Sequence, residues 1–203
     1  MYSIEGVILM EECSKSIVRR MSNPLFLRRY FVGNGIDIGG KPDPLGKYIE
    51  FFPFITSIKT WDMEEGDAQL MQGVEDETYD FVVSSHCLEH LVDTHEGIKN
   101  WFRIVKPGGF LIVVVPDEDL YEEKLPVSNY HNWSLTIYKH ETWSDKSVNV
   151  IDLLIELGPR AEIEKIELLR ATYRDSLRGT DQTHTPVAEP SIEFIVRKSI
   201  LIG

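Results

Sequence analysis

The sequence has little cysteine and no long apolar run. Only Cys13 and Cys87 occur among 203 residues, which is too few for a disulfide framework and gives no zinc-ligand spacing. No segment approaches the roughly 20 apolar residues that span a bilayer, and no basic stretch with an apolar core marks a signal peptide at the amino terminus. These absences predict a cytoplasmic globular protein with no membrane partner and no metal site.

Positive charge is also scarce. There are 21 Lys and Arg residues against 33 Asp and Glu residues, which gives a formal net charge of −12 at pH 7. A chain of this charge repels phosphate backbones, so we expect no nucleic-acid partner. The length suits one α/β domain with its own core. Because no internal repeat or composition break is evident, residues 1–203 are expected to form a single domain.

The first glycine-rich segment lacks the fingerprints of the common nucleotide-binding loops. The series Gly33-x-Gly35-x-x-Ile38 has isoleucine where a dinucleotide fingerprint needs its third glycine, and the P-loop lysine pattern is missing. These gaps disfavour a nicotinamide-dependent oxidoreductase. A short strand over 35–38 is expected instead, with Asp37 near its end. The Asp37 carboxylate is placed to accept hydrogen bonds from a ligand ammonium or from loop amides.

The strongest pattern is a strand–helix–strand unit over residues 79–116. The runs 81–84 and 110–115 are apolar without alternation, as in parallel strands that are buried on both faces. Between them, apolar residues recur at helical spacing up to a Pro-Gly-Gly stop. Ser84 to His90 and Asp117 to Asp119 follow the two strands. In open α/β sheets the ligand crevice lies at such carboxyl ends.

Four segments in order resemble the class I S-adenosylmethionine-dependent methyltransferases. They are Asp37–Gly40, Trp61–Met63, Gly66–Ala68, and Tyr79–His90 with its Lys106–Gly109 sequel. The resemblance runs from about Gly35 to Pro116 and more weakly to the end. It implies a Rossmann-like three-layer αβα sandwich with a mostly parallel sheet. It also implies a C-terminal antiparallel hairpin over residues 161–169 and 191–198.

The resemblance implies how one half of the site would bind S-adenosylmethionine. Asp37, Gly39 and Gly40 would line the methionine part of the cofactor. Asp62 would hold the ribose hydroxyls, and Met63 would lie against the adenine. These roles are carried over position by position from the matching motifs.

The second half of the implied site comes from the following motifs. Asp67 would accept from the adenine amino group, and Ala68 would pack or donate beside it. Ser84 and Ser85 would lie beneath the carboxylate and the sulfonium of the cofactor, and His86 would face the methyl group.

The sequence departs from the family pattern in two places. Lys41-Pro42-Asp43 replaces the second half of the usual glycine-rich loop. Asp62 and Asp67 are five positions apart, where the family inserts a helix and a strand. We therefore predict a sheet trimmed on the side of its second and third strands, with an open outer wall beside the adenine.

The flanking segments are expected to serve the acceptor side. Residues 1–30 are expected to form a helical cap, either as a cover for one sheet edge or as a lid over the ligand crevice. Its arginines are expected either to form a solvated face or to meet an anionic group (Arg19, Arg20, Arg28 and Arg29). Residues 31–116 form the expected cofactor half, and 117–203 an acceptor-side insert followed by the hairpin. The aromatic and histidine residues of the insert are candidates for an acceptor pocket or for a surface excursion packed on itself (Tyr130, His131, Trp133, Tyr138, His140 and Trp143). A helix over 148–157 and a long loop over 173–189 complete this part.

The function indicated is methyl transfer to a small-molecule, sugar or glycan acceptor, with S-adenosylhomocysteine as the product and O- or N-methylation left open. The motifs of adenine-amino, cytosine-C5 and metal-dependent catechol methyltransferases are missing. His86 has the best expected position for a general base, ahead of His90, His131 and His140. A catalytically inactive module that binds the cofactor or a protein is the alternative, and a homodimer is compatible with the sequence.

Overall fold

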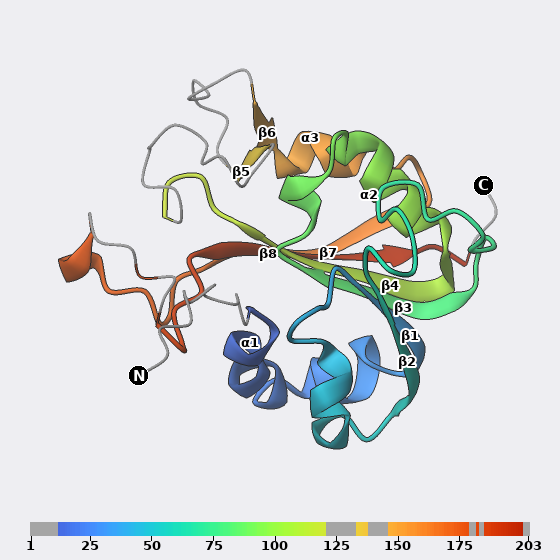
Figure 1. Ribbon diagram of the computed structural model, residues 1–203, viewed down its shortest axis with the longest axis horizontal. Helices are drawn as coiled ribbons and strands as arrows, with labels where there is room; N and C mark the ends of the chain where they lie inside the picture. The colour runs from blue at the N-terminus through green and yellow to red at the C-terminus, as the bar shows by residue number, and fades with distance from the viewer. Residues whose placement is uncertain (1–11, 121–132, 138–145, 179–181, 183–184, 201–203) are drawn as a thin grey trace, which may run out of the picture.

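The computed structural model describes residues 12–120, 133–137, 146–178, 182 and 185–200. A six-stranded sheet in the order β2-β1-β3-β4-β8-β7 runs through its centre, and β5 pairs with β6 in a small second sheet (Figure 1). The strands are β1 (Gly33–Ile38), β2 (Ile55–Trp61), β3 (Tyr79–Ser85), β4 (Val105–Pro116), β5 (Ser134–Thr136), β6 (Ser147–Asn149), β7 (Ala161–Leu169) and β8 (Ser191–Lys198).

The helical segments cover both faces of the large sheet. They are α1 (Glu12–Met21), the π-helix η1 (Phe26–Tyr30), the 3-10 helices η2 (Leu45–Phe51), η3 (Leu88–His90) and η4 (Asp175–Leu177), and the α-helices α2 (Thr94–Arg103) and α3 (Val150–Ile155). In Figure 1, α1 lies below the sheet with the blue helical turns near it, and α2 and α3 lie above it. None of the described helices is long and apolar enough to cross a membrane.

The sheet topology confirms the fold class expected from the sequence. Strands β2, β1, β3 and β4 are parallel, and β8 pairs antiparallel with both β4 and β7. The C-terminal hairpin has the expected bounds. The trimming is confirmed as well, because no described strand lies outside β2 and the whole connection 62–78 consists of turns and coil.

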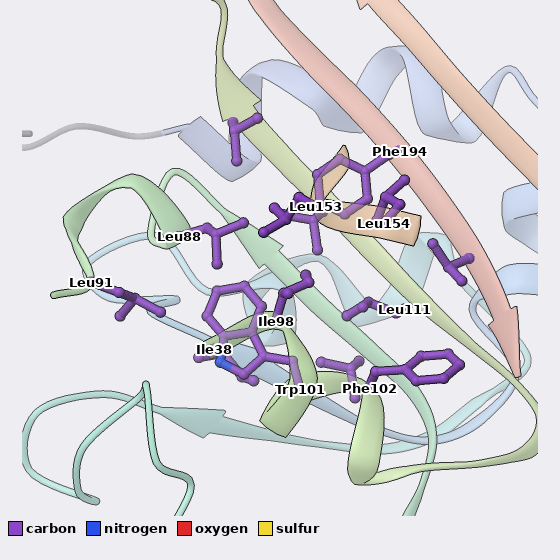
Figure 2. Close-up of a cluster of buried hydrophobic side chains, with 14 of the residues drawn as sticks. Ile38, Leu88, Leu91, Ile98, Trp101, Phe102, Leu111, Leu153, Leu154 and Phe194 are labelled. Atoms are coloured by element: carbon purple, nitrogen blue, oxygen red, sulfur yellow. The ribbon is translucent and has the colours of Figure 1, made fainter. Parts of the chain in front are cut away.

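The apolar runs of β3 and β4 supply both cores because successive side chains of a strand point to opposite faces. Val82 and Leu111 pack with α2 and α3 on one face, in the cluster that Figure 2 shows around Trp101. Phe81 and Ile112 pack on the other face, against α1, η1 and η2. Burial on both faces explains why these strands lack polar alternation.

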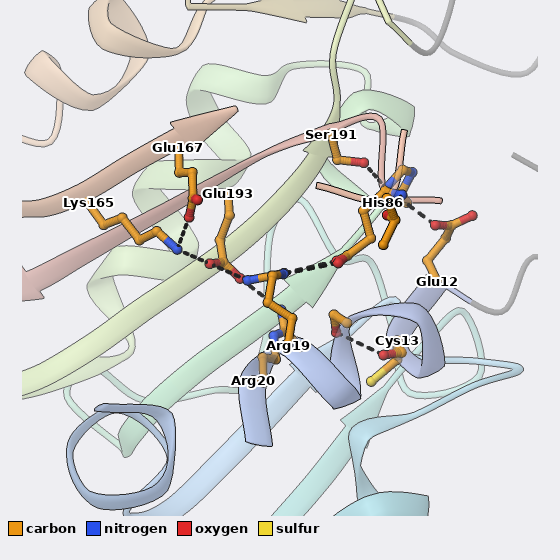
Figure 3. A network of polar contacts seen from close by, with 12 residues as sticks. Glu12, Cys13, Arg19, Arg20, His86, Lys165, Glu167, Ser191 and Glu193 are labelled. Carbon is orange, nitrogen blue, oxygen red and sulfur yellow. Dashed lines mark hydrogen bonds and ion pairs between the residues drawn. The ribbon is translucent and has the colours of Figure 1, made fainter. Parts of the chain in front are cut away.

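Buried ion pairs attach α1 to the C-terminal hairpin (Figure 3). Arg19 Nη1 lies 2.9 Å from Glu193 Oε2, and Lys165 Nζ lies 2.7 Å from the same oxygen. Arg20 is fully buried, with Nη2 3.5 Å from Glu193 Oε1 and its guanidinium 5.5 Å from the centre of the Phe26 ring. The expectation of a solvated arginine face is therefore wrong for Arg19 and Arg20, because the hairpin supplies a buried carboxylate opposite them.

Several expected boundaries shift in the structure. The described part of the expected N-terminal helix is split into α1 and η1, on either side of Pro24. The helix expected over 148–157 is confined to α3, because its first residues pair in β6. Helix α2 ends at Arg103, ahead of the Pro-Gly-Gly stop, which lies inside the long strand β4 that begins at Val105. Among the acceptor-pocket candidates, Tyr130, His131, Tyr138, His140 and Trp143 lie outside the described residues.

Candidate cofactor site and active site

A cavity of about 350 Å³ opens at the carboxyl ends of β1, β2 and β3. Its walls come from the start of α1, the loop after β1, the turn after β2, and the segment that joins β3 to η3. The lining residues are Glu12, Cys13, Asp37, Gly39, Gly40, Lys41, Pro42, Asp43, Asp62, Met63, Ser85, His86, Cys87 and His90. The cavity therefore lies where the strand pattern predicts the ligand crevice.

The floor of the cavity contains two glycines that no other residue could replace without strain. Gly39 has φ +70°, and a Cβ there would lie 2.6 Å from both Cβ and Sγ of Cys87. A Cβ on Gly40 would lie 2.6 Å from Asp37 Oδ2. The chain thus keeps its backbone bare where a ligand can approach closely.

Replacing Gly39 with alanine tests this crowding, and Gly73→Ala is the matched control. Both glycines have a positive φ, but nothing lies within 4 Å of a Cβ on Gly73. Left-handed strain costs each variant about 1–2 kcal/mol, and the contact with Cys87 costs Gly39→Ala about 1–3 kcal/mol more. Urea unfolding measures both free energies. Equal losses in the two variants would show that Gly39 is needed only for its φ.

Asp37 organises the loop after β1 from a buried position. Its Oδ2 accepts a 2.7 Å hydrogen bond from the backbone N–H of Leu45 at the start of η2. Burial raises the pKa of Asp37 to about 6, although the Leu45 N–H and Arg20 favour the charged form. Of the two partners expected for this carboxylate, the structure shows the loop amide.

Asp62 and Met63 form the wall at the end of β2. Asp62 Oδ2 accepts from the Lys41 N–H at 3.1 Å, and its Oδ1 accepts from the Met63 N–H at 2.8 Å. A carboxylate has about four lone-pair positions, so Asp62 retains acceptor capacity on its partly exposed side. Met63 lines the cavity, and its side chain is 91% exposed, so it presents an apolar surface at the cavity edge.

His86 lies at the corner between β3 and η3 in a left-handed conformation, with φ +53°. Its N–H donates to Val114 O at 2.9 Å, which fixes the backbone against β4. The ring Nε2 is 3.0 Å from Ser191 Oγ and 3.7 Å from Glu12 Oε2, and Nδ1 is 3.7 Å from Glu89 Oε1. Figure 3 shows Ser191 and Glu12 facing the ring from β8 and α1.

Three residues of the expected site do not line the cavity. Ser84 is fully buried, and its Oγ donates to Ile38 O at 2.8 Å. Asp67 Oδ1 accepts from the Gln69 N–H at 2.7 Å within its own turn. The Ala68 carbonyl accepts from Trp101 Nε1 at 2.7 Å. The turn over 66–68 therefore packs toward α2, and a role for it beside the adenine remains a prediction.

A family model described as a methyltransferase domain matches residues 16–147, which is more than half of the chain. The chain belongs to the methyltransferase domain family. The resemblance drawn from the sequence is confirmed, and S-adenosylmethionine is the cofactor of this family.

The curated relatives of this methyltransferase-domain chain are much longer than the chain itself. A hybrid PKS-NRPS synthetase, gkaA of Penicillium citrinum, is 45% identical over 56 residues, which is 28% of this chain and 1% of that protein. A reducing polyketide synthase, grgA of a Penicillium species, is 28% identical over 88 residues, which is 43% of this chain and 4% of that protein. The chain thus matches only a few per cent of their length.

Solved structures support the methyltransferase fold over most of the chain. A Bacillus halodurans protein assigned as a methyltransferase has a TM-score of 0.57 at 14% identity and covers 91% of this chain and 99% of its own. An S-adenosylmethionine-dependent methyltransferase from Mesorhizobium loti has a TM-score of 0.54 at 13% identity, with 83% and 93% covered. At this identity the likeness concerns the fold alone.

A lid over the crevice was one of the two expectations for residues 1–30, but sequence reasoning named no residue of α1 in the methyltransferase cavity. Glu12 and Cys13 line it from α1. Asp43 fixes the loop below them, since its Oδ2 accepts from the Ser14 N–H at 2.7 Å and its Oδ1 from Tyr48 OH at 2.6 Å. No local motif marks these residues, because only the folded contact between α1 and the loop brings them to the cavity.

The two cavity thiols are not activated. Burial raises the pKa of Cys13 to about 12, and burial also raises the pKa of Cys87. A thiol is nucleophilic only as the thiolate. These residues therefore act as small packing groups at neutral pH, and the titratable chemistry of the cavity comes from its carboxylates and histidines.

Proposed function

We propose that this protein binds S-adenosylmethionine in the 350 Å³ cavity and transfers its methyl group to a small-molecule, sugar or glycan acceptor, by O- or N-methylation. The supporting observation is the convergence of the Gly39–Gly40 floor, Asp62 and His86 on one hollow at the carboxyl ends of the strands. The match to the methyltransferase domain family supports S-adenosylmethionine as the ligand of this hollow.

The residues present fit the cofactor at its polar points. Gly39 and Gly40 line the cavity with backbone alone, which lets the methionine part approach closely, and Cys87 and Asp37 already occupy the space that a Cβ at these positions would need. Asp62 keeps lone pairs for two ribose hydroxyls beside the turn that it already orders. Ser85 and His86 line the next part of the wall.

The cofactor supplies an activated methyl group when bound, so the protein has mainly to align the acceptor and exclude water. Asp62 and the glycine loop would fix the position of the nucleoside and of the amino acid part. The start of α1 closes this side of the cavity with Glu12 and Cys13. The buried ion pairs of Arg19 with Glu189 and Glu193 hold that helix in place.

His86 is the residue that we assign to proton removal from the acceptor. It lines the cavity, and its ring is within 4 Å of side chains from α1, η3 and β8. An O–H or N–H nucleophile loses a proton as its bond to carbon forms, and a nearby imidazole can accept that proton near neutral pH.

Calorimetry with S-adenosylmethionine and S-adenosylhomocysteine tests the first step. We expect saturable binding of both, because Asp62 offers a carboxylate to the ribose hydroxyls and the Gly39–Gly40 backbone lines the side proposed for the amino acid part. Failure of both to bind at millimolar concentration would contradict the proposed function. If they bind, a panel of hydroxyl and amine acceptors with S-adenosylhomocysteine release as the readout separates an enzyme from an inactive cofactor-binding module.

A further inference from the structure

We propose that Glu89 is the positioning residue of His86: its buried carboxylate holds a proton on Nδ1 and leaves Nε2 as the basic nitrogen. This inference rests on the proposed function only in one respect, namely that His86 removes a proton from the methyl acceptor. The geometry itself concerns the protein without any ligand.

The two residues face each other because of the local turn after β3. His86 directly follows the strand, and Glu89 is three positions later in η3, where it is fully buried. Glu89 Oε1 lies 3.7 Å from His86 Nδ1 and 3.7 Å from His90 Nε2. A buried carboxylate at this distance favours a proton on the facing nitrogen, since an opposite charge within about 4–6 Å stabilises the charged form.

The opposite side of the ring faces groups from two other elements. Ser191 Oγ lies 3.0 Å from Nε2 and can donate its hydroxyl proton when Nε2 is the unprotonated nitrogen. Glu12 Oε2 lies 3.7 Å from the same Nε2. Glu12 opposes Glu89 from the Nε2 side, but its carboxylate also pairs with Lys15 at 2.8 Å, and Glu89 is the more deeply buried of the two. With Ser191 as a donor to Nε2, Glu89 then favours the neutral tautomer with its proton on Nδ1.

The remaining charged groups around the corner are already paired with one another. Glu12 Oε1 lies 2.8 Å from Lys15 Nζ on α1. On β8, Glu193 is shared by Arg19, Arg20 and Lys165. Among the residues that the structure describes, the carboxylates within 4 Å of the ring are Glu12 at Nε2 and Glu89 at Nδ1.

This arrangement has a direct consequence for proton transfer. When Nε2 takes a proton from the acceptor, the resulting imidazolium lies between the two carboxylates. Glu89 stabilises that positive charge from the buried side, where water does not screen it. Glu89 thus acts through His86 and need not touch the acceptor or the cofactor.

The test is an NMR titration of the histidine rings in the ligand-free protein. In the wild type we expect the neutral His86 ring to carry its proton on Nδ1, as read from the ¹⁵N shifts. Glu89→Gln keeps the side-chain shape and removes the charge, so the titration midpoint of His86 should fall by about 1 pH unit. Glu89→Asp keeps the negative charge, so the His86 midpoint in that variant should lie at least halfway from the Glu89→Gln value back to the wild-type value.

A second background separates the two histidines that Glu89 faces. In His90→Gln, the change Glu89→Gln should still lower the His86 midpoint by a similar amount. A neutral His86 with its proton on Nε2, or a midpoint that Glu89→Gln leaves within 0.2 pH units of the wild type, would overturn the proposal. The tautomer is read in the wild type, so this outcome is available even if the variant does not fold. Neither readout requires cofactor binding, so a failed calorimetric test is a separate result.

Discussion

Replacing Glu193 with glutamine should lower the free energy of unfolding by about 3–5 kcal/mol. Glu193 is fully buried among Arg19, Arg20 and Lys165. Arg19 keeps its pair with Glu189, but Arg20 Nε and Nη1 make no hydrogen bond in the described structure. The variant would leave the Arg20 charge buried without a carboxylate, and this is the main cost. Urea unfolding at pH 7 measures the loss.

An exposed ion pair provides the control for Glu193→Gln. Arg170 and Asp175 lie 2.6 Å apart with side chains 49% and 65% exposed, so Asp175→Asn should cost less than about 1 kcal/mol. A loss below 1 kcal/mol in Glu193→Gln would show that the cluster adds nothing to stability beyond a surface pair.

The same network makes the free energy of unfolding depend on pH in the acid range. Burial alone would raise the pKa of Glu193, but Arg20, Arg19 and Lys165 outweigh it and lower that pKa to about 2. The folded-state pKa lies below the unfolded value of about 4.3. The stabilisation by Glu193 is therefore complete above the unfolded value and is lost as the pH falls from about 4.3 towards 2. The difference between wild type and Glu193→Gln should shrink over that range.

The largest expected effect on binding belongs to Asp62. Asp62→Asn should weaken S-adenosylhomocysteine binding by about 100-fold, because hydrogen bonds to a charged group contribute about 1.5–3 kcal/mol each. An amide offers one acceptor atom where the carboxylate offers two, and the turn already needs acceptors for the Lys41 and Met63 amides. Calorimetry on the purified variant measures the dissociation constant.

Glu64 supplies the matched control two positions further along. Its side chain is 81% exposed, and its carboxylate pairs with Lys41 at 2.6 Å. Glu64→Gln removes one negative charge near the cavity without removing a wall residue, so binding should change by less than about threefold. If both variants bind S-adenosylhomocysteine as tightly as the wild type, the ribose role of Asp62 is wrong.

The sequence predicted most of the sheet because strand burial leaves a clear pattern. The hairpin strands β7 and β8 have the expected bounds, and β1, β3 and β4 contain the expected runs. The short spacing between Asp62 and Asp67 predicted the trimmed sheet, since the four residues between them cannot form a helix and a strand. These features depend on local composition and on chain length, which a sequence states directly.

The contribution of α1 could not be predicted in the same way. Arg19 and Arg20 have the composition of a solvated helix face, and their buried partner Glu193 is more than 170 residues away. Glu12 carries no motif, yet it reaches the ring of His86. The segment Gly66–Ala68 matches the family motif in sequence. In the structure it packs toward α2, because the Ala68 carbonyl accepts a hydrogen bond from Trp101 Nε1.

The trimmed sheet leaves β2 as an edge strand among the described strands, and Lys59 lies in that strand. With β2 outermost among the described strands, one row of its backbone N–H and C=O groups lacks a neighbouring strand. Such a row can recruit a strand from another molecule and lead to aggregation. Lys59 lies within β2, with its ammonium 4.8 Å from the centre of the Trp61 ring. A second chain that added to this edge would have to desolvate that ammonium, so Lys59 works against self-association.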